Sequence, residues 1–193
     1  GGTITTKNSF TNSGNMTVNN IFTHDSGVLT NTGSITNNGT FINKSTMITH
    51  QFDNNNIFKI FNNGAITIST SGYFTNETAS TFINYGSTTN NGIITNNSTM
   101  KNYKTMTISV DASLVNTLNF TNYQPDPSTV DTTTDGINLT GTTPLITNNG
   151  TITNEAILKN DSYGIINNHS TITNNSNLNN EHVINNKATG IIR

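Results

Sequence analysis

The sequence contains no cysteine and no tryptophan, only three prolines, and few charged residues, which make up 9 % of its 193 positions. The absence of cysteine excludes a disulfide framework, a thiolate metal site and a cysteine nucleophile. An ordinary soluble domain carries about 25 % charged residues. The formal net charge is only -2, so no basic surface is expected for nucleic acid. No run of about 18 apolar residues occurs, so no membrane-spanning helix is expected either.

Asparagine and threonine take the place of the missing residue types, and each makes up about a fifth of the chain. Such bias occurs in disordered chains, which bury too little apolar surface to offset the entropy of ordering. Disordered chains are typically rich in charge and proline, however, and the apolar residues of this chain are regularly spaced. An AT-rich genome does not explain the asparagine, because it would raise lysine as well, and Lys and Arg together number 8. The composition therefore favours a fold that needs asparagine.

A six-residue repeat, with an apolar residue in the second place and asparagine in the fourth, is clearest in residues 145–193. The step between units is six residues and lengthens where a glycine or Tyr-Gly is inserted. We expect the apolar residues to form a core stack of Ile146, Ile152, Leu158, Ile166, Ile172, Leu178 and Ile184. We expect the asparagines to form an inward ladder of Asn148, Asn154, Asn160, Asn168, Asn174, Asn180 and Asn186.

Residues 1–106 follow the same repeat with more variation, and the spacing slips around residues 52–68. The asparagine place holds Val18, His24 or Thr49 in three units, and the apolar place holds Thr88 in another. Stacking is expected to be looser at Val18, His24 and Thr88.

A six-residue period suits short strands joined by tight bends, and neither an α-helix nor a long strand. Residues i and i+2 of a strand face the same side, so the apolar residue and its asparagine both point inward. Asn-Gly, Asn-Asn and Asn-Ser pairs are expected to turn the corners, because Asn and Gly tolerate left-handed backbone angles. Three faces make a coil of about 18–20 residues. The predicted fold is therefore all-β, a three-sided parallel β-helix (β-solenoid) that forms one domain over residues 1–193.

Coil stacking gives a physical reason for the asparagine. Successive coils lie about 4.8 Å apart, and a buried amide needs hydrogen-bond partners. Identical amides on the coils above and below supply them, as in stacked cross-β arrays.

Residues 107–144 break the repeat and contain all three prolines and four of the ten acidic residues. We expect an insertion here that leaves the solenoid wall and offers a contact loop with Tyr123, Asp126, Asp131 and Asp135. The three aspartates could approach a Ca²⁺ ion, but their spacing does not match an EF-hand loop. A solvated loop is the favoured interpretation, and no metal or cofactor is expected.

The units GSITNNGTFIN, GIITNNST and NNGTITN resemble the G-T-I-x-N-x-G repeats of large bacterial adhesins of the filamentous haemagglutinin type. They are also similar to asparagine-rich repeat proteins on some archaeal and giant-virus surfaces. The resemblance covers residues 1–106 and 145–193. It implies a right-handed parallel β-helix at an exposed, extracellular or cell- or virion-surface location, and it brings no catalytic motif.

Parallel β-helices also include polysaccharide lyases and hydrolases, so a carbohydrate-active domain is the alternative. Asp161 and Glu181 are twenty residues apart and should lie close together on adjacent coils; glycosidases need two carboxyl groups about 5–9 Å apart. Two solvated corner residues are the favoured interpretation. The four histidines, at positions 24, 50, 169 and 182, lack metal-ligand spacing and are expected at the surface.

Outward threonines raise the possibility of ice binding. Thr151 and Thr153 should align with Thr171 and Thr173 on the next coil. Equivalent places elsewhere hold Asn, Ser, Lys or Phe, so no long uniform row is expected. The sequence as a whole predicts a non-catalytic structural or adhesive segment of a surface adhesin, fibre or filament. Its expected partners are further copies or coils end to end, and cell-surface glycans or proteins.

Overall fold

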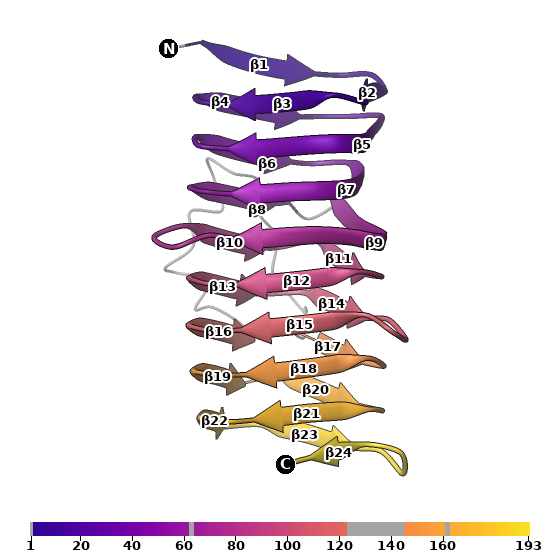
Figure 1. The fold of residues 1–193 in the computed structure, drawn as a ribbon, viewed down its shortest axis with the longest axis vertical. Helices are drawn as coiled ribbons and strands as arrows, with labels where there is room; N and C mark the ends of the chain where they lie inside the picture. Colours follow the sequence, from indigo (N-terminus) through magenta and orange to yellow (C-terminus); the bar gives the residue numbers. More distant parts are fainter. Residues whose placement is uncertain (1, 62–63, 123–144, 161–162) are drawn as a thin grey trace.

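The structure is a computed structural model that describes residues 2–61, 64–122, 145–160 and 163–193. In these residues every regular element is a β-strand, and every strand pair is parallel. The strands wind into a three-sided solenoid (Figure 1), which confirms the predicted all-β class and parallel β-helix. We call the three sides face 1, face 2 and face 3 in the order in which the chain visits them, and the level of one strand within a face a rung.

Face 1 is a nine-stranded sheet with one strand from every coil. Its strands are β1 (Thr3–Thr6), β4 (Ile21–His24), β6 (Thr40–Asn43), β8 (Ile57–Ile60), β10 (Thr81–Asn84), β13 (Thr99–Asn102), β16 (Asn119–Asn122), β19 (Ile157–Asn160) and β22 (Asn177–Asn180).

Faces 2 and 3 form one larger sheet, because the long strands β5 (Val28–Asn37), β7 (Thr46–Asn54) and β9 (Ala65–Asn76) run through the corner between them. Face 2 comprises β2 (Phe10–Asn12), the first halves of the long strands, β11 (Ser87–Asn90), β14 (Thr105–Ile108), β17 (Leu145–Asn148), β20 (Ile165–Asn168) and β23 (Val183–Asn186). Face 3 comprises β3 (Asn15–Val18), the second halves of the long strands, β12 (Ile93–Asn96), β15 (Ser113–Asn116), β18 (Thr151–Asn154), β21 (Thr171–Asn174) and β24 (Ile191–Ile192).

The coil is right-handed, as Figure 1 shows. The strands of face 3 lie nearest the viewer and run leftward, while those of face 2 run rightward behind them as the chain descends. This handedness agrees with the one that the sequence resemblance implies.

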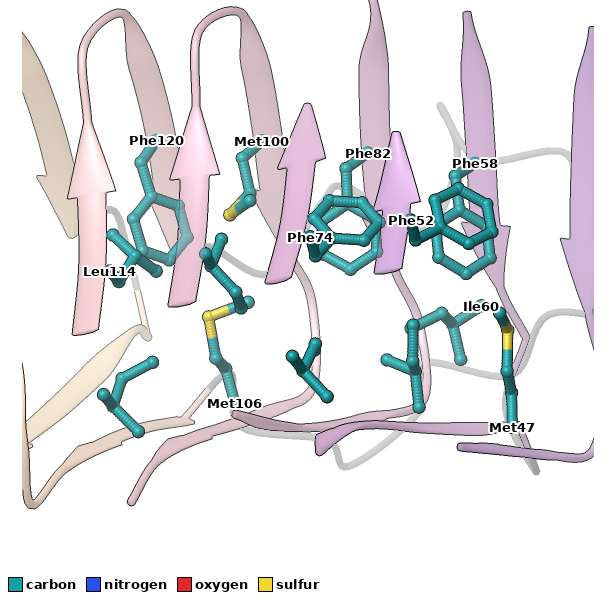
Figure 2. Packing of buried hydrophobic residues seen from close by; sticks show 14 of the residues in the cluster. Met47, Phe52, Phe58, Ile60, Phe74, Phe82, Met100, Met106, Leu114 and Phe120 are labelled. Atoms are coloured by element: carbon teal, nitrogen blue, oxygen red, sulfur yellow. The ribbon is translucent and has the colours of Figure 1, made fainter. Parts of the chain in front are cut away.

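The core fills the inside of the solenoid, where each four-residue strand contributes its second and fourth side chains. Of the predicted stack, Ile146, Ile152, Leu158, Ile166 and Ile172 are fully buried, while Leu178 and Ile184 are partly buried and pack against the core. In the middle coils, phenylalanine rings pack beside methionine, isoleucine and leucine side chains (Figure 2). The rings of Phe52 and Phe58 stack with centroids 4.8 Å apart, and Phe52 stacks on Phe74 at 5.4 Å. Such ring pairs add about 0.5–1.5 kcal/mol beyond the area that they bury.

The expected insertion does not begin at residue 107. Strands β14, β15 and β16 continue the solenoid wall to Asn122, with Leu114 and Phe120 fully buried in the core. The repeat is hard to see here because Ile108 occupies the asparagine place and the next bend, residues 109–112, has four residues instead of two. Residues 123–144, with Tyr123, Asp126, Asp131 and Asp135, lie outside the described residues, so the contact loop stays a prediction.

The expectation that Asn and Gly turn the corners with left-handed angles is wrong at the short bends. Of the described glycines only Gly27 has a positive φ, of 85°. Glycine at a short bend allows close approach instead: a Cβ on Gly92 would lie 2.2 Å from the carbonyl oxygen of Gly72 on the adjacent coil. Left-handed angles occur in four-residue bends, where Ser71 and Asp111 each have φ 63°.

Candidate functional site: an asparagine scaffold and the surfaces it supports

The asparagine in the fourth place of each strand ties three coils together. In the central example, Asn96 Nδ2 donates to Asn116 Oδ1 at 2.7 Å and to the carbonyl oxygen of Asn119 at 3.0 Å. Its Oδ1 accepts from Asn76 Nδ2 at 2.7 Å and from the backbone N–H of Ser98 at 3.4 Å. The fully buried amide therefore bonds to both neighbouring coils and also closes its own corner. This satisfies the hydrogen-bonding requirement of a buried amide.

The predicted ladder residues belong to three ladders, one for each face. On face 2, Asn148 donates to Asn168 and Asn168 to Asn186; the pair on face 3 is Asn154–Asn174, and the pair on face 1 is Asn160–Asn180, with Nδ2 to Oδ1 distances of 2.7–2.8 Å throughout. Asn148, Asn154, Asn160 and Asn168 are fully buried, whereas Asn180 and Asn186, in the last coil, are exposed.

From Asn37 onward the ladder on face 3 is continuous, with the buried Val18 in the asparagine place of its first rung, whereas the other two ladders contain internal breaks. On face 3, side-chain amides donate from one coil to the next over Asn37, Asn54, Asn76, Asn96, Asn116, Asn154 and Asn174. On face 2, Thr49, Ile68 and Ile108 occupy asparagine places, and on face 1 Ile60 does so. Face 3 is therefore the most regular wall of the rod.

Two of the irregular side chains keep the hydrogen bonds of the ladder. His24 was expected at the surface, but it is fully buried: its Nδ1 lies 3.0 Å from Thr6 Oγ1 and its Nε2 lies 3.1 Å from the carbonyl oxygen of Thr46. The ring thus spans adjacent coils as an asparagine amide does. Thr49 accepts from Asn31 Nδ2 at 2.9 Å. The other three histidines are exposed, as expected.

The three outer faces differ in charge, because the first and third residues of each strand point outward. Face 1 carries Lys59, Lys101 and Lys159 in third places, and face 3 carries Asp53. Slight burial and, secondarily, the negative charge of Asp53 raise the pKa of its neighbour Tyr73. The outward residues of the described strands of face 2 include no charged side chain.

The structure describes only one residue of the predicted carboxylate pair, Asp161 and Glu181. Glu181 Oε1 forms an ion pair with Lys159 Nζ at 3.1 Å, and Asp161 lies outside the described residues. Two other acids, Glu77 and Glu155, occupy the corner after face 3, where Asn97 and Asn175 bond to them. They are separated by three rungs, about 14 Å at the usual strand spacing. That exceeds the separation that glycosidases use.

A groove that the sequence did not predict lies at the corner between faces 2 and 3. Two four-residue bends, 69–72 and 109–112, stand on either side of the short Asn91–Gly92 bend and enclose a volume of about 460 Å³. Ser109 Oγ donates to Asn91 Oδ1 at 2.6 Å across the floor. The lining includes the Asp111 carboxylate, hydroxyl groups, and two exposed apolar side chains, Ile93 and Val110. The only sequence signal was the extra length of both bends.

A short aromatic column lies outside the main core at the corner between faces 1 and 2. Tyr85 and Tyr103 stack with centroids 4.8 Å apart and an interplanar angle of 7°, and Phe61 continues the column. All three are buried, and Ile42 and Ile83 pack against them. The signal in the sequence was tyrosine directly after asparagine in three face 1 units, of which the third, with Tyr123, lies outside the described residues.

No family model matches the chain, and comparisons with curated proteins and with solved structures give no match. Over the ranges that the structure describes, no three His, Cys, Asp or Glu side chains gather as a metal site. Nor does any helix in those ranges reach the length and apolarity needed to cross a membrane. The fold and its ladders are consistent with repeats of the surface-adhesin kind.

Proposed function

We propose that the chain is a structural and adhesive β-solenoid segment of an extracellular surface adhesin, fibre or filament, and that it is not an enzyme. The observation that carries the proposal is the continuous ladder on face 3, from Asn37 to Asn174, beside a single apolar core cluster that extends from Val18 to Ile172. Backbone bonds and side-chain amides both run along the rod axis from one coil to the next. Bending or shearing the rod must therefore break both sets of bonds together, which makes it a stiff spacer.

The outer surface supports the adhesive part of the proposal. Its strands present mostly threonine, asparagine and serine, which offer hydrogen bonds at little desolvation cost compared with charged groups. The first and last strands of face 1 each have one neighbour in the sheet order. Their free edges can pair with a further coil or with another copy of the chain.

The mechanical part is tested by pulling single molecules from both ends. We expect unfolding in steps of about one coil, as for other arrays in which each repeat contacts only its neighbours. Asn96→Ala should lower the unfolding force, and Asn179→Ala, an exposed outward residue of the last coil, is the matched control. A chain that extends smoothly without force peaks would contradict the role of a stiff spacer.

The adhesive part is tested with beads coated with the chain and allowed to settle on glycan-coated or cell-coated surfaces under flow. Retention above that of uncoated beads is expected.

The non-catalytic part is tested by incubating the chain with a panel of polysaccharides. Turnover that disappears in Asp161→Ala or Glu181→Ala, and not in Glu155→Ala, would overturn it.

The corner groove favours a second candidate function, carbohydrate binding without turnover. Its carboxylate, hydroxyl groups and apolar side chains provide the mixed lining that small-molecule sites use. Binding of short glycans, measured by calorimetry, should be lost in Asp111→Ala and kept in Glu77→Ala, which alters a carboxylate on another corner. Equal glycan binding by both variants would show that the groove is not the binding site.

A further inference from the structure

Strand register gathers threonines into a column on face 2. In the third, outward place, Thr67, Thr89, Thr107 and Thr147 lie on four consecutive rungs, each paired directly with the next. Thr11 and Thr30 continue the column beyond a single interruption at Ile48. The expectation that no long uniform row forms holds for the Thr151/Thr153 row on face 3, which ends at Ser113 and Val115, but it overlooked these four consecutive threonines on face 2. The row is hidden in the sequence because its members are unequally spaced, with Thr107 and Thr147 forty positions apart.

The surroundings of this column are small or apolar. The first places on the same four rungs hold Ala65, Ser87, Thr105 and Leu145, none of them charged. Lysines interrupt face 1, and Asp53 interrupts face 3. Face 2 is thus the one side whose described strands present no charged outward side chain that would impose its own hydration shell.

The spacing of the column is set by the backbone. Adjacent rungs lie about 4.8 Å apart, and the first and third places of one strand about 6.6 Å apart. The rung spacing, which is the spacing of the threonine column, is close to a repeat distance in the lattice of hexagonal ice. The threonine side chain is stiff at χ1, and the solenoid core beneath it is fully buried. The hydroxyl and methyl groups are therefore held in place before any ligand arrives, which lowers the entropy cost of binding.

We propose that face 2 binds ice, with the threonine hydroxyl groups hydrogen-bonded to lattice water and their methyl groups seated between water molecules. The proposal is independent of the adhesive role, because it requires only the folded chain and frozen water. A second copy of the chain packed on the same face is the competing occupant. Ice is favoured because the column repeats at every one of these four rungs and because its polar groups are hydroxyls, which both donate to and accept from water.

The test is partition of the purified chain into a slowly growing ice front, measured as the protein concentration in ice relative to liquid. The double variant Thr89→Lys/Thr107→Lys places two charges at the middle of the column. It should lower the enrichment about tenfold, equivalent to about 1.4 kcal/mol of binding free energy. The matched control, Thr75→Lys/Thr95→Lys, alters paired third places on face 3 and should leave the enrichment unchanged.

A milder pair, Thr89→Val/Thr107→Val, keeps the shape and strand propensity and removes only the hydroxyls. Circular dichroism should show it folded, and its enrichment should fall clearly below that of the unaltered chain. Full enrichment in the valine pair would overturn the role of the hydroxyl groups. An unaltered chain that stays in the liquid would overturn ice binding altogether. An equal loss of enrichment in the face 3 control would also overturn ice binding. A dimer that sedimentation detects and that the face 2 lysines abolish, with no enrichment in ice, would show that a second copy occupies the face.

Discussion

Ile108 lies directly across from Asn148 on the adjacent rung of face 2, and the buried Oδ1 of Asn148 has no hydrogen-bond partner. In an intact ladder that oxygen accepts from the asparagine of the preceding coil. The isoleucine has no donor to offer, so the ladder that continues through Asn168 and Asn186 begins with an unpaired acceptor. An unpaired buried polar group costs about 1–3 kcal/mol.

Replacing Ile108 with threonine should lower the free energy of unfolding less than other isoleucine-to-threonine changes in the core. Thr6 Oγ1 reaches His24 Nδ1 on the following coil at 3.0 Å from the same place in its strand, so the hydroxyl in Ile108→Thr can donate to Asn148 Oδ1. The control is Ile68→Thr in the same column, where Asn90 Oδ1 already accepts from the backbone N–H of Gly92. We expect losses in unfolding free energy of about 1 kcal/mol for Ile108→Thr and about 2–3 kcal/mol for Ile68→Thr. Equal losses in urea unfolding would contradict this account.

Thr88→Val should stabilise the protein. Thr88 occupies an apolar place between Ile66 and Met106, and its buried hydroxyl oxygen has no hydrogen-bond partner. Valine has nearly the same shape and removes the unpaired group, so the unfolding free energy should rise by about 1–2 kcal/mol. Thr89→Val, at the neighbouring outward position, should change it by less than about 0.5 kcal/mol. A less stable Thr88→Val variant in thermal unfolding would show that the hydroxyl is satisfied.

The cost of removing an asparagine should depend on its place in a ladder. Asn96→Ala leaves the buried Oδ1 of Asn116 without its donor and takes the side-chain acceptor from Asn76, so we expect a loss of about 3 kcal/mol. Asn90 lies between Ile68 and Ile108 and bonds only to backbone groups. Asn90→Ala should therefore cost about 1–2 kcal/mol. Denaturant unfolding of the two variants measures the difference, and identical losses would count against coupling along the ladder.

His24→Asn should be tolerated and His24→Ala should not. An asparagine can donate to the carbonyl oxygen of Thr46, as His24 does. Alanine leaves that oxygen and Thr6 without a partner and opens a cavity, at a cost of about 2–4 kcal/mol. His50→Ala, at an exposed corner, is the control and should lie within about 0.5 kcal/mol. Equal loss in the asparagine and alanine variants would show that ring volume, and not hydrogen bonding, is what the site requires.

The fold could be predicted from the sequence because one physical requirement recurs in every coil. An inward apolar residue followed two places later by an inward amide leaves little choice but stacked short strands. The prediction of an insertion from residue 107 failed for a local reason. Ile108 fills the inward fourth place of its strand as a buried apolar side chain. A repeat defined by asparagine in that place therefore cannot be recognised there, although the strand continues.

The surfaces were less predictable than the core, because they depend on which residues meet across coils. The Thr67 to Thr147 column and the groove beside Asp111 both follow from bend lengths that the spacing of the repeat does not fix. His24 was misjudged for a related reason: histidine is usually only partly buried, and its fit to an amide place is visible only once Thr6 and Thr46 are brought beside it.

Variable bends have a consequence for how such a rod can change. The coil from Phe41 to Phe58 takes 17 residues and the next, from Phe58 to Phe82, takes 24, yet all three residues meet in register on face 1. A corner can therefore gain or lose residues without shifting any strand on either side. Peptides grafted into chosen corners would be displayed at multiples of the rung spacing, about 4.8 Å. The solenoid could therefore hold binding groups at set distances from one another.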